Sequence, residues 1–350
     1  MRKRIKQIMS ILLISTLLTA CSEETATQPK PAQPTNETPA GGQTHTEPNA
    51  NAYTSPLTGL ASNVPVDKRP VMVMMNNHPK ARPQSGLNQA DIVYEVLAEG
   101  EVTRFLAIFQ SQKPEVIGPV RSIRPYFIDI GRGFDAVLVH AGGSPDALET
   151  LAQNDFSNIN EISNGAYFWR EKFRRAPHNL YTDLDRIEQA IQDKGMRPSA
   201  TVPNLLFLPA ETTITSGEPA AKIDVTFHPA YKISYAYDQA KGKYLRFTQG
   251  TAHTDLQTKE QLSVTNLLVI ASAHRVLDRE GRRAVDVVGP GDGYLFQQGK
   301  ARKVKWRRKD GVIRAYEDAA FTKEIPLLAG NTWINIVPNV PGLDQSVKFQ

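Results

Sequence analysis

Short apolar runs alternate with polar loops in the part of the chain that follows residue 55. Gly100 and Glu101 separate the run at 91–97 from the run at 103–109, which predicts a β-hairpin. The runs have the length and the β-branched or aromatic content of strands, and they lie at 71–75, 91–97, 103–109 and 136–140.

Two helices are predicted among these strands. Ser144 followed by Pro145 has the pattern of a helix start, and 183–194 predicts a second helix that Gly195 ends. Strands and helices in this mixed order predict a mixed α/β domain over 56–211.

The second half of the chain has a different pattern. Residues 212–221 are rich in Pro, Thr, Ser, Glu and Ala, which predicts a linker. Short alternating segments separated by Gly, Asp or Pro then predict a mainly antiparallel β domain over 222–350, so that the whole chain is of the α+β or mixed class. These segments lie at 223–227, 232–237, 243–247, 267–271, 294–297, 303–306 and 332–337.

The first residues have the organisation of a secretory signal. Arg2, Lys3, Arg4 and Lys6 precede an apolar run at 8–18 that is shorter than a membrane span. The run ends in Leu18-Thr19-Ala20-Cys21, which resembles the lipobox of bacterial lipoproteins. This resemblance implies a signal peptide over 1–20 and a lipid, including palmitate-type acyl chains, on Cys21. The expected location is the extracytoplasmic face of the cell membrane, and the alternative is a short anchor with an incidental cysteine.

Composition adds three points. Residues 21–55 are mostly small or polar, which predicts a lipidated, disordered tether. Cys21 is the single cysteine of the chain, so no disulfide is expected. The formal net charge is +5, of which the four basic residues before residue 8 supply all but +1, so no nucleic-acid partner is expected.

Polar loops next to the predicted strands carry the candidate chemistry. A Gly-Gly turn at a helix start exposes backbone N–H groups that favour an anion, and Arg121 and Arg124 are expected to approach it. The strand at 136–140 is expected to be central. The alternative is that Asp129, Asp135 or Asp146 neutralises both arginines. The candidate anion-binding residues are Arg82, Arg104, Arg121, Arg124, Gly142, Gly143, Ser144, His178 and Asn179.

No complete catalytic motif is found, so catalytic residues stay unassigned. Ser144 lacks the GxSxG context of a nucleophile. Histidines and carboxylates that could supply metal ligands lack HxH or HExxH spacing, so no metal site or cofactor is assigned, although a divalent metal remains open. The ligand candidates are His78, His140 and His178 with Asp91, Glu95 or Glu101. The basic run 302–309 is either a solvated strand face or a patch for anionic wall polymer or lipid headgroups.

Several longer segments resemble the YerB-type lipoproteins of Bacillus and its relatives. The resemblance covers the mature folded chain and implies a lipoprotein with a two-part body and no assigned reaction. The segments are 82–87, 90–95, 103–105, 118–124, 176–179 and 332–338.

A second similarity concerns only the order of motifs. Arg82 and Asp91, then 117–121, then Gly142-Gly143 follow the order found in LytR–CpsA–Psr enzymes, which transfer wall polymers from a lipid carrier. The chain departs from that pattern because no aspartate follows Arg121. This similarity implies, by analogy only, a wall-polymer transferase.

Two functions remain open. The first is a binding or accessory module for an anionic cell-wall polymer or a wall-synthesis protein, held at the membrane by the lipid. The second is an enzyme that acts on a phosphorylated or anionic envelope glycan. Convergence of the candidate arginines and His178 on one pocket with a carboxylate would favour the enzyme.

Overall fold

The computed structural model describes residues 53–350. The predicted signal peptide, Cys21 and most of the predicted tether lie outside the described residues. Strand β1 (Tyr53–Thr54) pairs with β2 (Ala61–Ser62), so the folded part already includes the last residues of the predicted tether. No helix in the described range is long and apolar enough to cross a membrane.

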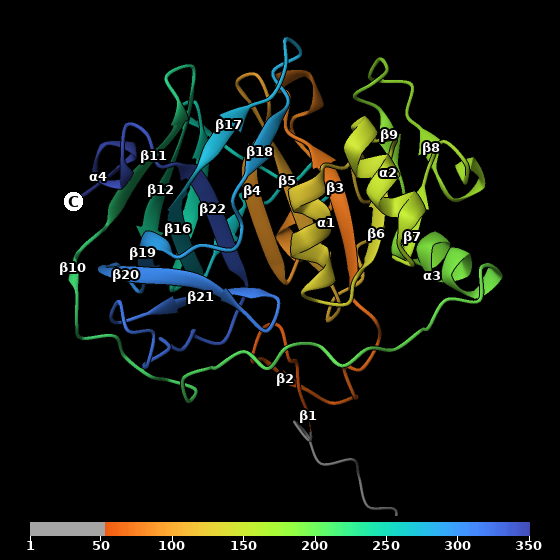
Figure 1. Ribbon diagram of the computed structural model, residues 1–350. Coiled ribbons are helices and arrows are strands. Elements are labelled where there is room, and N and C mark those ends of the chain that lie inside the picture. The colour runs from red at the N-terminus through yellow and green to blue at the C-terminus, as the bar shows by residue number, and fades with distance from the viewer. Residues whose placement is uncertain (1–52) are drawn as a thin grey trace, which may run out of the picture. The chain divides into compact units, whose positions relative to one another are not determined.

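An eleven-stranded sheet forms the centre of the molecule (Figure 1). It continues through both predicted domains, because β22 from the end of the chain pairs in parallel with β4 from the first half. The strands in order are β10 (Glu218–Pro219), β20 (Lys300–Lys309), β19 (Gly291–Gln297), β16 (Asn266–Ser272), β22 (Thr332–Pro338), β4 (Ile92–Glu99), β5 (Val102–Phe109), β3 (Val71–Asn76), β6 (Val137–His140) and β7 (Asn158–Asn160), with β21 (Val312–Tyr316) paired to β20.

The order of strands differs from the expectation in one respect. The strand predicted at 136–140, β6, was expected to be central, but it lies next to the edge strand β7. The prediction was wrong because β22 and β16 insert beside β4 and place the centre elsewhere. The predicted hairpin is present as β4 and β5.

The pairing directions show that β3, β4, β6, β16 and β22 run the same way. Their carboxyl ends therefore lie at one end of the large sheet, the upper end in Figure 1.

A second, antiparallel sheet covers part of the first. Its inner face contributes Ile223, Val225 and Tyr235 to a core shared with Val93 and Trp333 of the large sheet. Ile223 and Val225 are buried while Lys222 and Asp224 are exposed, which is the alternation that the sequence predicts. The strands in order are β14 (Thr251–Ala252), β13 (Lys243–Thr248), β12 (Tyr231–Asp238), β11 (Lys222–His228) and β23 (Val347–Phe349), with β15 (Ser263–Val264) paired to β13.

Helices are few. Helix α2 (Pro145–Gln153) begins at the predicted residue, and α3 (Leu184–Asp193) is capped by the Asp183 carboxylate, which accepts a 2.7 Å hydrogen bond from the Arg186 amide. Helix α1 (Pro125–Arg132) was not predicted, although Pro125 suits a first helical position. The short elements are η1 (Pro79–Ala81), η2 (Leu87–Gln89), η3 (Gly165–Tyr167), β8 (Trp169–Arg170), β9 (Leu180–Tyr181), β17 (His274–Val276), β18 (Arg283–Val285) and α4 (Leu343–Ser346).

The predicted α+β class is confirmed, since strands greatly outnumber helices and the second half is largely antiparallel. The segment predicted as a linker is partly structured: β10 pairs with β20, and Ala220 is completely buried. The division into domains at 56–211 and 222–350 stays a prediction, within a molecule whose main sheet draws strands from both halves.

Candidate functional site

Three segments meet at the carboxyl end of β3. The Arg121 amide donates to Met74 O at 2.7 Å, and the Val120 amide donates to Leu180 O at 2.7 Å. The segment that carries Arg121 therefore runs between the end of β3 and strand β9. This places the loop after β3 and the loop before β9 on either side of Arg121.

Two histidines from these loops stack on each other. The rings of His78 and His178 have centroids 4.6 Å apart and an interplanar angle of 19°. The Asn76 side-chain oxygen accepts from the His78 amide at 3.0 Å, so its NH₂ group is the donor to His178 Nδ1 at 3.0 Å. His78 Nδ1 accepts from the Lys80 amide at 3.1 Å. Each ring consequently carries its proton on Nε2, which has no hydrogen-bond partner among the described residues.

The surroundings keep both rings neutral. Burial lowers the pKa of His78, and the positive charges of Lys80, Arg82 and Arg121 lower it further. Burial likewise lowers the pKa of His178, followed by the effects of His78 and Arg121. Two neutral rings with free Nε2–H groups are hydrogen-bond donors, and this arrangement favours an acceptor-rich ligand.

The Arg121 guanidinium lies near these rings and has no partner among residues 53–350. Burial lowers the pKa of its guanidinium, and no acidic residue contributes to that shift. In the part of the chain that the structure describes, no carboxylate and no hydrogen-bond acceptor contacts this guanidinium. A half-buried cation without a counter-ion is costly, because the lost hydration is not replaced.

Arg124 lies in a different environment from Arg121. Its guanidinium contacts Glu99, which also forms a 2.6 Å ion pair with Arg104. Arg121 and Arg124 belong to an extended segment, in which residues three apart point to opposite faces. The expected joint site of the two arginines is therefore divided. Glu99, at the end of β4, pairs with Arg124, and Asp146 adds an attraction at longer range. No acidic residue contributes to the pKa of Arg121, so neither Asp129, Asp135 nor Asp146 neutralises both arginines.

The Gly-Gly turn lies beside the arginine segment, as the sequence suggested. The Ile123 amide donates to Gly142 O at 3.0 Å, and the Ser144 amide donates to Ile123 O at 3.2 Å. Gly142 has a φ of +65°, which favours glycine, and its amide donates to Asn160 Oδ1 at 2.9 Å. A side chain on Gly143 would collide with Ile123. Ser144 Oγ makes no capping hydrogen bond. The amides of Gly142 and Ser144, which were expected to face an anion, thus already donate hydrogen bonds to neighbouring residues.

Arg82 and Asn179 hold the local structure. Arg82 donates to Asn77 Oδ1 at 2.9 Å and to Asn77 O at 2.7 Å, and its guanidinium lies 5.1 Å from the centroid of the Tyr231 ring. Asn179 donates to Glu171 O at 2.9 Å. Neither side chain is free for a ligand, so the candidate residues do not converge on one pocket.

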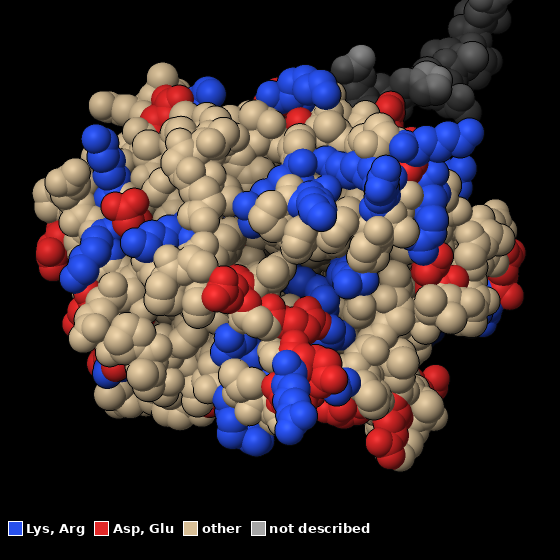
Figure 2. Space-filling view, turned by 90° about the horizontal axis from the view of Figure 1, so that it is seen from above, with Lys and Arg blue, Asp and Glu red and all other residues tan. Residues whose placement is uncertain are grey.

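Two basic residues near the histidines were not among the candidates. Lys80 is exposed, and Arg174 donates to Tyr181 Oη at 2.7 Å and to Pro83 O at 2.7 Å. Both lie in polar loops, but no spacing rule links them to Arg121. We define the strand-end cluster as His78, Lys80, Arg121, Arg174 and His178. Figure 2 looks down on this end of the molecule, where lysines and arginines lie on one side of a hollow and acidic residues lie on the other.

Metal ligation and the basic run were the other candidates. No group of three or more His, Cys, Asp or Glu within residues 53–350 is placed to hold a metal ion. In the run 302–309, Val304 and Trp306 are buried. Lys303 pairs with Asp344 at 3.1 Å on the other face. This strand therefore presents a face with ion pairs, and a ligand for it stays a prediction.

Two family models match most of the described chain. The N-terminal domain of the "Protein of unknown function (DUF3048)" family matches residues 57–197, and its C-terminal domain matches residues 223–334. The chain belongs to the DUF3048 family. The family has no assigned function, so membership fixes relatives and boundaries but no reaction.

One relative of this DUF3048 protein is named "Putative lipoprotein YerB", from Bacillus subtilis (strain 168). It is 40% identical over 294 residues, which cover 83% of this chain and 88% of the relative. The crystal structure of YerB protein from Bacillus subtilis superposes with a TM-score of 0.77 at 38% identity, and covers 85% of this chain and 99% of that chain. The resemblance to YerB-type lipoproteins is confirmed. The comparisons do not show the similarity to LytR–CpsA–Psr enzymes.

Proposed function

We propose that this DUF3048 protein is a membrane-anchored, extracytoplasmic lipoprotein that binds a phosphate-bearing polymer of the cell envelope through the strand-end cluster. The observation that carries the proposal is the half-buried Arg121 guanidinium, which has no acceptor or counter-ion in the described chain. An anion placed between Arg121 and the histidines would satisfy all three groups at once.

The chemistry of the cluster suits phosphate. Arginine gives paired N–H donors to phosphate oxygens, and the two Nε2–H groups add neutral donors from one side. Lys80 adds a flexible positive charge at the exposed rim. The lipoprotein name of the relative supports a location where wall polymers are available.

A binding role accounts for the cluster better than a reaction. The pKa values of His78 and His178 are lowered by burial and by positive charges, with no carboxylate among the causes. Glu99, the carboxylate at the end of β4, is occupied by Arg104 and Arg124. The two histidines thus lack the orienting carboxylate that a general base commonly uses. The enzyme hypothesis stays an alternative without a specific observation in its favour.

Isothermal titration calorimetry with pyrophosphate and with poly(glycerol phosphate) tests the proposal. We expect Arg121→Gln to weaken binding by about 10- to 100-fold, which corresponds to the loss of one charge-assisted hydrogen-bonded contact. Arg302→Gln is the matched control, because Arg302 is also half-buried with a lowered pKa but lies on β20 and donates to Gln297. Absence of binding to the wild-type protein, or equal binding by both variants, would refute the proposal.

A further inference from the structure

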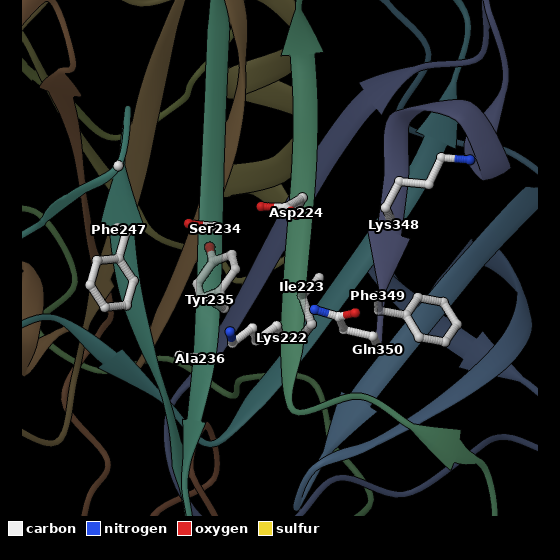
Figure 3. A pocket seen from close by; sticks show the side chains of 11 residues that line it. Lys222, Ile223, Asp224, Ser234, Tyr235, Ala236, Phe247, Lys348, Phe349 and Gln350 are labelled. Atoms are coloured by element: carbon white, nitrogen blue, oxygen red, sulfur yellow. The ribbon is translucent and has the colours of Figure 1, made fainter.

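The outer face of the second sheet carries a groove that is separate from the strand-end cluster. It has a volume of about 440 Å³ and is lined by residues from four strands, β13, β12, β11 and β23 (Figure 3). The sheet's other face is packed on the core. Only the outward side chains of these strands can therefore reach a ligand in the groove.

The strand register explains the shape of the groove. Ser234 is paired with Phe247 on one side and with Asp224 on the other, and Asp224 is paired with Lys348. Figure 3 shows these four residues in a row across the sheet. Ala236 lies two residues along β12 from Ser234. The small side chains of Ser234 and Ala236 leave a trough along β12 between larger neighbours, and the Lys222 side chain, opposite Ala236, extends over β12 into it (Figure 3).

The width of the trough follows from sheet geometry. Adjacent strands are about 4.8 Å apart, so Phe247 and Asp224 stand on strands separated by about 10 Å. This distance accommodates one six-membered ring lying over Ser234. A linear chain of such rings can follow the strand direction.

Most of the outward-facing side chains around the trough have no partner among residues 53–350. Lys222, Asp224, Ser234 and Gln350 make no side-chain hydrogen bond or ion pair within the described part of the chain, and Phe247 makes no ring contact there. Lys348 donates to the main-chain oxygen of Asp344 and leaves Asp224 unpaired. The trough therefore offers a hydroxyl, a carboxylate, an amide, an ammonium group and an aromatic ring to a ligand.

This set of groups matches the chemistry of a sugar chain. Sugar rings present C–H groups on their faces, which pack on an aromatic ring, and hydroxyl groups at their edges, which need both donors and acceptors. The mixed charges of Lys222, Asp224 and Lys348 do not select a strong anion. An added peptide strand is disfavoured, because the backbone of β12 is already paired on both sides.

We infer that this groove is a binding site for a linear oligosaccharide. The inference is independent of the strand-end cluster, which recognises phosphate. A polymer that carries both sugars and phosphates would offer a ligand to each site. The groove alone accounts for recognition of an uncharged sugar chain.

The test is calorimetric titration with the tetramer of N-acetylglucosamine, an uncharged oligosaccharide. We expect the wild-type protein to bind, and Phe247→Ala to weaken binding by about tenfold through the lost ring contact. Ala236→Tyr, which fills the floor of the trough with a residue suited to strands, should abolish binding. Phe173→Ala is the control, because Phe173 is 60% exposed and lies outside the groove.

Three outcomes would overturn the inference. They are no heat of binding with the wild-type protein, equal binding by wild type and Ala236→Tyr, and a dimer in sedimentation that Ala236→Tyr dissociates. The last result would show that a second copy of the chain covers this face. Circular dichroism of each variant establishes that the sheet is intact before the affinities are compared.

Discussion

Glu95 Oε2 and Arg246 Nη2 lie 2.8 Å apart, with the two side chains 0% and 1% exposed. Glu95 belongs to β4 of the large sheet, and Arg246 belongs to β13 of the second sheet. Tyr231 donates to Glu95 at 2.9 Å, and Arg246 donates to Tyr235 at 2.6 Å. This network joins the two sheets through charges that have no access to solvent.

Replacing either Glu95 or Arg246 alone should lower the free energy of unfolding far more than replacing both. A single Glu95→Leu change leaves a buried guanidinium without a counter-ion, for which we expect a loss of about 3–5 kcal/mol in the free energy of unfolding. The double change Glu95→Leu with Arg246→Met should recover most of that loss. Urea unfolding measures both.

A control for the same experiment is available on the surface. Lys303 and Asp344 form an exposed ion pair, with side chains 56% and 64% exposed. Lys303→Ala should change stability by less than about 1 kcal/mol. If Glu95→Leu were no more destabilising than Lys303→Ala, the ion pair would not join the sheets as described.

Acid should weaken the fold through a buried histidine in the same network. Burial, followed by the charge of Arg246, lowers the pKa of His253 well below its usual 6.5. The folded protein then holds His253 neutral while the unfolded chain takes up a proton. The free energy of unfolding is therefore unaffected by His253 above pH 6.5, and protonation of the unfolded chain lowers it progressively as the pH falls below that value.

Urea unfolding at pH 7.5, 6 and 5 measures this loss. His274 acts in the same direction, since burial lowers its pKa to about 4. Between pH 7.5 and pH 5, the free energy of unfolding of His253→Gln should therefore decrease less than that of the wild type, but it should still decrease. A decrease as large as that of the wild type would exclude His253 as a source.

Anion binding at the strand-end cluster should depend on pH in a defined direction. A bound anion raises the pKa of His78 and His178, so the complex takes up protons more readily than the free protein. The affinity for sulfate, whose charge is constant over this range, should increase from pH 8 to pH 5.5. Calorimetry with His178→Gln should show a weaker dependence. An affinity that is flat or that rises with pH would contradict this assignment.

The lipid anchor is a prediction about residues outside the described range. Cys21→Ala should leave the protein unlipidated, and either released from the membrane or kept as an unprocessed precursor, because two acyl chains are needed for stable anchoring. Membrane fractionation and gel migration measure this. A variant that fractionates and migrates like the wild type would show that Cys21 is not the anchor.

Local hydrophobic patterns in the sequence predicted most strands, but they did not predict which distant strands pair with each other. Alternation at Ile223, Asp224 and Val225 identified the buried face of β11, because that signal lies in neighbouring residues. The insertion of β22 beside β4 depends on contacts between residues that are far apart along the chain. No local pattern encodes such a pairing, which is why the position of β6 was predicted wrongly.

The candidate site shows the same limit. Arg121 and Arg124 were grouped because they are close in sequence, and the extended backbone between them turns their side chains apart. Glu99 lies next to the predicted hairpin turn, but its role as partner of Arg124 arises only when that hairpin packs against the loop that carries Arg124. The stacking of His78 on His178 joins loops that are 100 residues apart in the chain.

The most direct test of the strand-end cluster is a nitrogen-15 NMR titration of the histidine rings with sulfate. At pH 7 the free protein should show His78 and His178 as neutral rings protonated on Nε2. Sulfate should shift both Nε2 signals with one affinity, and Arg121→Gln should require about 10- to 100-fold more sulfate for the same shifts while leaving the tautomers unchanged. Signals that do not move with sulfate, or that move equally in Arg121→Gln, would contradict the assignment of this cluster as an anion site.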